Sequence, residues 1–146
     1  NAAIAAPYLA GWLDRLVSDG PAILCVGLPD TPPLQTGHRM TQRRVDLLAI
    51  EQNAWTLAAR DDRAVVTGTR TELDWAMKQG QISVWAPSKI VLDATQGPRV
   101  QPADSVALAA WFAAEMDARA LHVIGETPPS DATVPVCAAA VTADAL

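Results

Sequence analysis

Hydrophobic residues recur at helical spacing in several stretches of the chain. In the longest stretch, Leu47, Ile50 and Ala54 lie three or four positions apart, which places them on one face of a helix. The same spacing predicts helices at residues 5–19, 40–60, 69–80 and 103–118. Gly20 follows the first of these helices and Gly80 is the last residue of the third, as glycine commonly stands at the end of a helix.

Polar residues stand where two of these helices should begin. Thr71 is the expected N-cap of the third helix, and the pair Asp104-Ser105 precedes the Ala-rich fourth helix. A short oxygen-bearing side chain at this position accepts a hydrogen bond from a free backbone N–H and contributes about 1 kcal/mol. We therefore interpret Asp104-Ser105 first as a cap, with a phosphate or metal site as the alternative.

Continuous apolar runs lie between the helices, as expected of strands that are covered on both faces. A turn at Pro87-Ser88 divides one run into two short strands. The alternation of helices and strands predicts one α/β domain over residues 1–146, a three-layer α/β/α sandwich with a mainly parallel sheet. The expected strands are residues 22–27, 64–68, 82–92, 121–124 and 134–141.

Composition narrows the class of protein. Half of the 146 residues are hydrophobic and 18% are charged, which is typical of a globular chain. The net charge of −5 disfavours binding to nucleic acid. The apolar runs are shorter than the ~18 residues of a membrane span, and no secretory signal is visible. Cys25 and Cys137 stand in apolar, strand-like stretches and are interpreted as buried thiols in a cytoplasmic protein, with no metal site.

The common catalytic and phosphate-binding motifs are absent from the sequence. It contains no GxxxxGK[ST], GxSxG, HExxH, CxxC or GxGxxG pattern. The loop after the strand expected at 22–27 reads LPDTPPLQTG, and its prolines remove backbone N–H groups that a phosphate cradle would use. Only Gly27 and Gly37 offer the flexibility of such a cradle.

A basic cluster precedes and opens the long helix at residues 40–60. Guanidinium groups and a helix N-terminus both favour an anion, so the cluster is a candidate site for phosphate or carboxylate. The alternatives are a solvated first turn and ion pairs with Asp46 and Glu51. The residues of the cluster are His38, Arg39, Arg43 and Arg44.

Three consecutive polar residues, 51–53, interrupt the apolar pattern of the same helix. Because apolar residues flank them on both sides, some of the three must face the interior or another subunit. The pattern is consistent with a hydrogen-bonded network or a subunit contact. The five tryptophans are expected to serve core or interface packing.

Four stretches together resemble the amino acid kinase superfamily, which includes carbamate, acetylglutamate, aspartate and uridylate kinases. The resemblance spans roughly residues 5–125 and is nearest to the small branch similar to the kinase of aminomethylfuran phosphate in methanofuran-type cofactor synthesis. The stretches are YLAGWLDRLVSDGPAILCVG, RRVDLLAIEQNAWTLAA, ISVWAPSKIVL and ADSVALAAWFAAEMDARALHVI.

The resemblance implies that ATP and a small acidic substrate meet at the carboxyl edge of the sheet, where lysines and glycine-loop amides stabilise the moving phosphoryl group. Several family features are absent here. The strand that ends in Lys-x-Gly-Gly-Ser would precede Asn1, and the Gly-Gly-Gly loop corresponds to GLPDTPP, where only Gly27 remains. GETPPS replaces the lysine after a later strand. In an alignment without gaps Val106 falls at the position of the family's aspartate, and Asp104 matches it only if the helix start is shifted by two residues.

We therefore expect a degenerate, non-catalytic member that lacks the first strand and acts as a binding or regulatory subunit in one-carbon cofactor biosynthesis, within a homo- or hetero-oligomer. One alternative is an active kinase that uses ATP and Mg²⁺, and another is a binder of a small anionic metabolite. The candidate catalytic residues are Lys89 and Asp104. The candidate ligand-binding residues are Gly27, His38, Arg39, Arg43, Arg44, Ser88 and Ser105.

Overall fold

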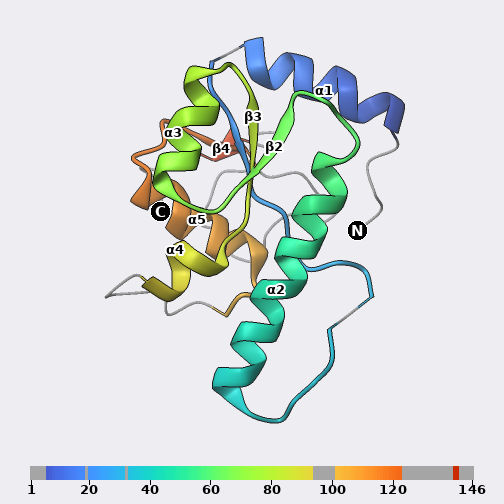
Figure 1. Ribbon diagram of the computed structural model, residues 1–146, viewed down its shortest axis with the longest axis vertical. Helices are drawn as coiled ribbons and strands as arrows, with labels where there is room; N and C mark the ends of the chain where they lie inside the picture. The colour runs from blue at the N-terminus through green and yellow to red at the C-terminus, as the bar shows by residue number, and fades with distance from the viewer. Residues whose placement is uncertain (1–5, 19, 32, 94–100, 123–139, 142–146) are drawn as a thin grey trace.

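The computed structural model describes residues 6–18, 20–31, 33–93, 101–122 and 140–141 (Figure 1). Helices alternate with short strands in the larger part of the chain, as the sequence predicts. The elements are α1 (Ala6–Ser18), β1 (Ile23–Leu24), α2 (Arg39–Ala58), β2 (Ala64–Thr67), α3 (Arg70–Lys78), β3 (Ile82–Trp85), α4 (Ser88–Asp93), α5 (Ser105–Glu115), β4 (Leu121–His122) and β5 (Ala140–Val141).

A parallel sheet of three strands lies at the centre of the fold, in the order β1-β3-β2. Leu24 of β1 and Val66 of β2 both lie opposite Val84 of the central strand. The mixed α/β class and the parallel pairing are therefore confirmed. β4 and β5 form a separate antiparallel pair.

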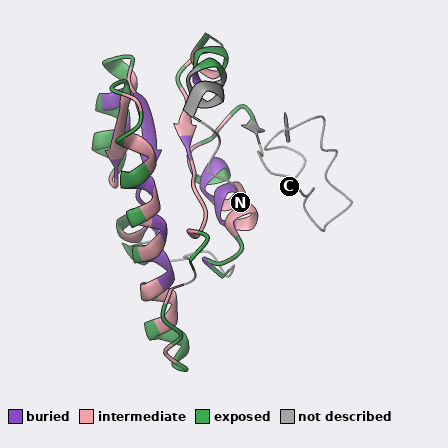
Figure 2. Ribbon diagram, turned by 90° about the vertical axis from the view of Figure 1, so that its right-hand side faces the viewer, coloured by how far each residue is buried: buried purple, intermediate pink, exposed green. Residues whose placement is uncertain are grey.

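Side chains of β3 alternate between two packing clusters. Ile82 and Val84 pack with Leu24, with Leu13 of α1 and with Ala54 of α2. In Figure 1, α1 and α2 lie to the right of the sheet and α3 and α5 to its left. All four residues of β3 are buried, which is visible as a continuous purple strand in Figure 2.

The second cluster is built around an aromatic stack. The rings of Trp85 and Phe112 lie 3.8 Å apart between centroids and within 8° of parallel. Leu73 of α3, Val91 of α4 and Leu108 of α5 belong to this cluster, and α2 adds Leu47 and Ile50. The large aromatic area that is buried here fixes α5 against the end of β3.

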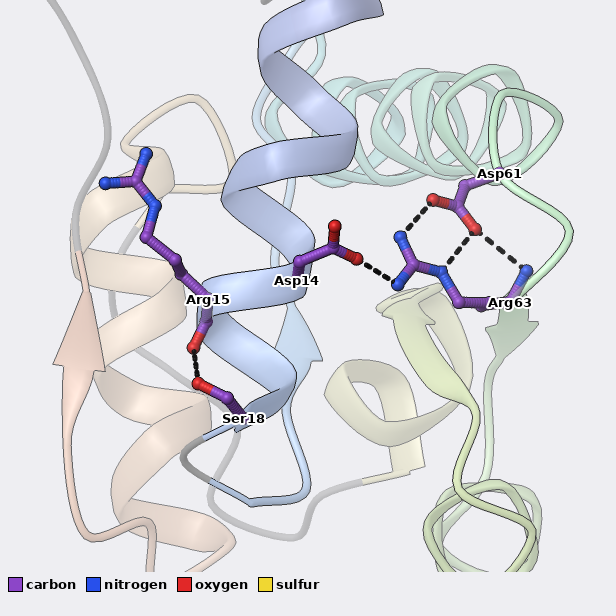
Figure 3. A network of polar contacts seen from close by, with 5 residues as sticks. All are labelled: Asp14, Arg15, Ser18, Asp61 and Arg63. Atoms are coloured by element: carbon purple, nitrogen blue, oxygen red, sulfur yellow. Dashed lines mark hydrogen bonds and ion pairs between the residues drawn. The ribbon is translucent and has the colours of Figure 1, made fainter.

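Polar contacts attach α1 to the turn before β2 (Figure 3). Arg63 donates to Asp14 of α1 and, at 2.8 Å, to the carboxylate of Asp61. The hydrogen bond from Arg63 lowers the pKa of Asp61. This exposed network links the first helix to the amino end of the sheet.

Two local predictions are wrong. Residues 88–92 form the helix α4 instead of a second short strand, because Val91 donates to the carbonyl of Pro87 at 2.9 Å and its side chain enters the core. Three consecutive apolar residues do not distinguish a strand from a helical turn. The N-cap of α3 is Thr69, not Thr71, because Thr69 forms a capping box with Glu72.

The remaining differences concern the ends of elements. β1 comprises two residues of the stretch expected at 22–27, because the segment after Leu24 leaves the ladder. Of the strands expected at 121–124 and 134–141, the structure describes residues 121–122 and 140–141, and Cys137 lies outside the described residues. Within the described part of the chain, no helix has the length and apolarity to cross a membrane.

Candidate functional site

The three parallel strands end at one side of the sheet, which we call the carboxyl edge (residues 25–27, 67–69 and 85–89). In open parallel sheets, ligands bind at this side. Three sequence-predicted residues belong to the carboxyl edge, namely Gly27, Ser88 and Lys89. Ser105, at the start of α5, lies next to Gly27, and Asp104 precedes it.

Gly27 permits the close approach of α5. A Cβ atom at this position would lie 2.9 Å from Cβ and 3.1 Å from Oγ of Ser105. The carbonyl of Gly27 accepts a hydrogen bond of 2.9 Å from Nδ2 of Asn53. The glycine therefore brings the start of α5 against the end of β1, and its carbonyl is occupied by α2.

Asp104 is the N-cap of α5, as the sequence predicts. Its Oδ1 accepts a hydrogen bond of 3.0 Å from the backbone N–H of Ala107. The carboxylate thus satisfies one of the free donors of the first turn. The capping interpretation of Asp104-Ser105 is confirmed, and the acidic group that is nearest to the start of α5 has a structural partner.

Glu51 and Asn53 form a polar network with the carboxyl edge. Oε1 of Glu51 accepts a hydrogen bond of 2.9 Å from the backbone N–H of Ser88, thirty-seven residues away in the sequence. Asn53 donates to Gly27, as described above. Of the two alternatives for residues 51–53, the structure shows a hydrogen-bonded network for Glu51 and Asn53, while Gln52 between them is exposed.

A second carboxylate lies at the end of β2. Oε2 of Glu72 accepts hydrogen bonds from the backbone N–H groups of Gly68, at 2.7 Å, and Thr69, at 3.1 Å. The bond from Gly68 is the main cause of a lowered pKa of Glu72, to which the bond from Thr69 and the charge of Lys89 also contribute. A Cβ built on Gly68 would lie 3.8 Å from Cδ of Lys89. Lys89 therefore shares this corner with the carboxylate of Glu72.

Among the described residues, five buried polar side-chain atoms have no hydrogen-bond partner, and three of them belong to the carboxyl edge. These three are Oγ1 of Thr67, Nε1 of Trp85 and Oγ of Ser88, and the other two are Oε1 of Gln81 and Oγ of Ser83. Thr67 and Trp85 are each only 2% exposed. Most buried polar groups are paired with protein, water or a ligand, so the three atoms at the carboxyl edge are candidate contacts for such a partner.

The basic cluster is separated from the carboxyl edge. Nδ1 of His38 accepts a hydrogen bond of 3.3 Å from the N–H of Thr41, so His38 is the N-cap of α2. Arg39, Arg43 and Arg44 follow in the first turns of that helix. Glu51 stands twelve positions after Arg39, or roughly 18 Å along the helix axis. The predicted site residues thus form two groups, and His38 with the three arginines is not brought to the edge.

The described residues hold no group of three His, Cys, Asp or Glu side chains that could bind a metal ion. Cys25 lies at the start of the carboxyl edge, where burial raises the pKa of its thiol to about 12. A thiol with this pKa is protonated at neutral pH.

Thr67, Gly68 and Glu72 belong to the site and were missed by the sequence analysis. The spacing Thr69-x-x-Glu72 is a capping-box signature, so the position of Glu72 could have been predicted. The approach of Lys89 to Gly68 has no local signal, because it depends on how β2 and α4 pack. Comparison of the chain with profiles of known protein families, with characterised proteins and with solved structures finds no match.

Proposed function

We propose that the chain is a degenerate, non-catalytic domain of the amino acid kinase type, which serves as a binding or regulatory subunit. In this proposal the described α/β core is part of a three-layer α/β/α sandwich. The support from the sequence is the resemblance over roughly residues 5–125, together with the replacement of the family's Gly-Gly-Gly loop by GLPDTPP.

One structural observation carries the non-catalytic part of the proposal. Backbone donors of the carboxyl edge are bonded to carboxylates of the chain itself. Glu51 accepts from Ser88, and Glu72 accepts from Gly68 and Thr69. A phosphoryl-transfer site needs such donors free and directed at the oxygens of the phosphate.

Charge supports the same conclusion. Two carboxylates at the edge repel the anionic oxygens of a nucleotide, and Glu72 offsets the positive charge of Lys89. Each donor lost from a transition-state site costs on the order of 2–4 kcal/mol. The loss of several donors together therefore removes turnover while leaving the fold intact. From the family resemblance we propose a role of the subunit in one-carbon cofactor biosynthesis of the methanofuran type.

Titration of the chain with Mg-ATP, followed by calorimetry and by a coupled assay for ADP, tests this function. We expect no saturable heat at millimolar nucleotide and no ADP release. The matched variant Glu72→Gln keeps a hydrogen-bond acceptor for Gly68 but removes the charge, and it should bind ATP or inorganic phosphate more tightly than the parent. Micromolar ATP affinity of the parent chain together with ADP release would overturn the proposal.

An active kinase is the rival function, and the closeness of Lys89 to Gly68 is the observation that favours it. In that case ATP and Mg²⁺ would bind at the carboxyl edge, with Lys89 next to the transferred group. ADP release that is lost in Lys89→Met but retained in Lys78→Met would establish this function. Lys78 is an exposed residue at the end of α3 and serves as the matched control.

Binding of a small anionic metabolite at the basic cluster is a separate candidate. His38 and the exposed guanidinium groups of Arg39 and Arg44 lie at the N-terminus of α2, where the helix dipole favours an anion. Phosphate and dicarboxylate titrations of the parent and of Arg43→Ala test this site. If the affinities for all these anions are unchanged in Arg43→Ala, this candidate is excluded.

A further inference from the structure

The outward face of α2 carries large apolar side chains that no described segment covers. Trp55 is 65% exposed and Leu48 is 60% exposed, although both belong to a helix whose other face is fully buried at Leu47 and Ala54. The two exposed residues are seven positions apart, which is two helical turns. They therefore lie on the same side of α2.

The outward positions of α2 follow a heptad spacing. Starting at Thr41, steps of four and three residues alternate along the helix and pass through both exposed apolar residues. This spacing is that of the seam between two helices in a left-handed pair. We call these positions the α2 seam, which comprises Thr41, Val45, Leu48, Gln52, Trp55 and Ala59.

The charges of α2 are opposed to its own dipole. The helix has no acidic residue in its first turn and no basic residue in its last turn. Arg39 and Arg44 are exposed near the positive N-terminal end. Cations are stabilised near the C-terminus of a helix, so an antiparallel neighbour of the same kind would place each pair of arginines beside a C-terminal end.

Charges of both signs follow that C-terminal end. Residues 60–63 carry two guanidinium groups, of Arg60 and Arg63, and two carboxylates, of Asp61 and Asp62. Figure 3 shows Asp14 and Asp61 directed at Arg63. The carboxylate of Asp62 is exposed at this end.

We propose that the α2 seam is the contact with a second copy of this chain, in a two-fold symmetric antiparallel dimer. A two-fold contact pairs a surface with itself, and the seam is complementary to itself in both shape and charge. With residue 50 at the centre, Leu48 faces Gln52 of the second copy and Val45 faces the second copy's Trp55. The large ring of Trp55 thus lies opposite the smaller side chain of Val45.

The same register explains the position of the arginines. Arg44 neighbours Val45, so its guanidinium lies near the Trp55 ring of the second copy, where a cation–π contact forms. Arg39 faces the aspartates at positions 61 and 62 of the second copy, beside the negative end of the dipole of that copy's α2. This dimer is independent of the kinase resemblance and of the carboxyl edge, because none of its residues contacts the edge.

Sedimentation equilibrium of the full chain tests the dimer. We expect a dimer at tens of micromolar and a loss of affinity of about tenfold or more in Trp55→Glu, since a buried aromatic anchor dominates such contacts. Trp75→Glu is the matched control, because Trp75 is 55% exposed on α3, outside the seam. A parent chain that is still monomeric at about 200 µM would overturn the proposal. So would an equal loss of dimer affinity in Trp55→Glu and Trp75→Glu.

Cross-linking tests the antiparallel orientation. In a background with Cys137→Ser, the double variant Thr41→Cys/Ala59→Cys should form a disulfide-linked dimer under mild oxidation, because these positions face each other between copies. Thr41→Cys alone is the control, since its two copies lie at opposite ends of the seam. Equally efficient cross-linking in this single variant would contradict the antiparallel arrangement.

Discussion

At the scale of single residues, the carboxyl edge depends on side chains that are small enough or correctly placed to let neighbours approach. Gly27 has an ordinary backbone conformation, and its requirement comes only from the closeness of Ser105. Gly80 instead follows the C-cap of α3 with a φ of 69°, a left-handed backbone conformation that glycine adopts without strain. Two glycines in one chain thus serve different physical purposes.

The substitution Gly27→Ala should destabilise the chain. Its new Cβ would lie 2.9 Å from Cβ of Ser105, so α5 must shift, at a cost of about 1–3 kcal/mol. Gly11→Ala is the control, because nothing lies within 4 Å of a Cβ at this helical position. It should stabilise by about 0.5–1 kcal/mol. Urea unfolding measures both, and equal effects would contradict the close approach of α5 to β1.

At the scale of elements, helix starts and helix packing are decided by different parts of the sequence. α3 begins at Thr69 because its capping box is local. α5 begins at Asp104 for the same reason, but its orientation depends on the stack of Phe112 on Trp85. Local signals therefore place the ends of helices, and long-range packing positions their axes.

Removing the charge of Glu72 should make stability less dependent on pH. The folded-state pKa of Glu72 is lowered, chiefly by the N–H of Gly68, so its stabilisation is present above the unfolded pKa and is lost as the pH falls through the folded value. Glu72→Gln should therefore be less stable than the parent at pH 7 and similar to it at pH 3. Urea unfolding at the two pH values measures this, and a constant difference would refute it.

The aromatic stack should be a major source of stability for α5. Phe112→Ala leaves a cavity against Trp85 and should lower the free energy of unfolding by about 3–5 kcal/mol. Trp75→Ala removes an aromatic ring that is mostly exposed and should change stability by about 0.5 kcal/mol or less. Thermal unfolding followed by circular dichroism compares the two. Similar losses in both would show that the stack does not hold α5.

At the scale of the whole molecule, exposed ion pairs join segments that are distant in the sequence. Arg63 attaches α1 to the turn before β2, and Arg70 reaches Glu115 at the end of α5, with 3.3 Å between the charged atoms. Exposed pairs contribute little to global stability, so their role is to hold the outer helices locally.

Arg63→Ala should loosen α1 without unfolding the core. The variant removes the contacts with Asp14 and Asp61, while Leu13 remains buried against β3. Amide hydrogen exchange should become faster in α1 and stay unchanged in β3. Arg60→Ala, which removes an exposed arginine from the same turn, is the control. Unchanged exchange in α1 would show that apolar packing alone holds this helix.

The sequence by itself determined the α/β class, the positions of the main helices and the cap at Asp104, because periodicity and capping are encoded over a few neighbouring residues. It also indicated that residues 51–53 face a polar partner. Only the tertiary structure decided that this partner is the backbone of Ser88 and Gly27.

The tertiary structure alone also decided that the basic cluster is separated from Lys89. It likewise decided that Glu51 and Glu72 bind backbone N–H groups of the carboxyl edge. Such contacts join residues up to tens of positions apart, and no local pattern specifies which strand ends meet. The short run at 88–92 became helical for a similar reason, since the burial of Val91 against α2 and α5 outweighed its strand-like composition. Local propensity contributes less free energy than the burial of an apolar side chain, so packing in the core determined the helical conformation of this run.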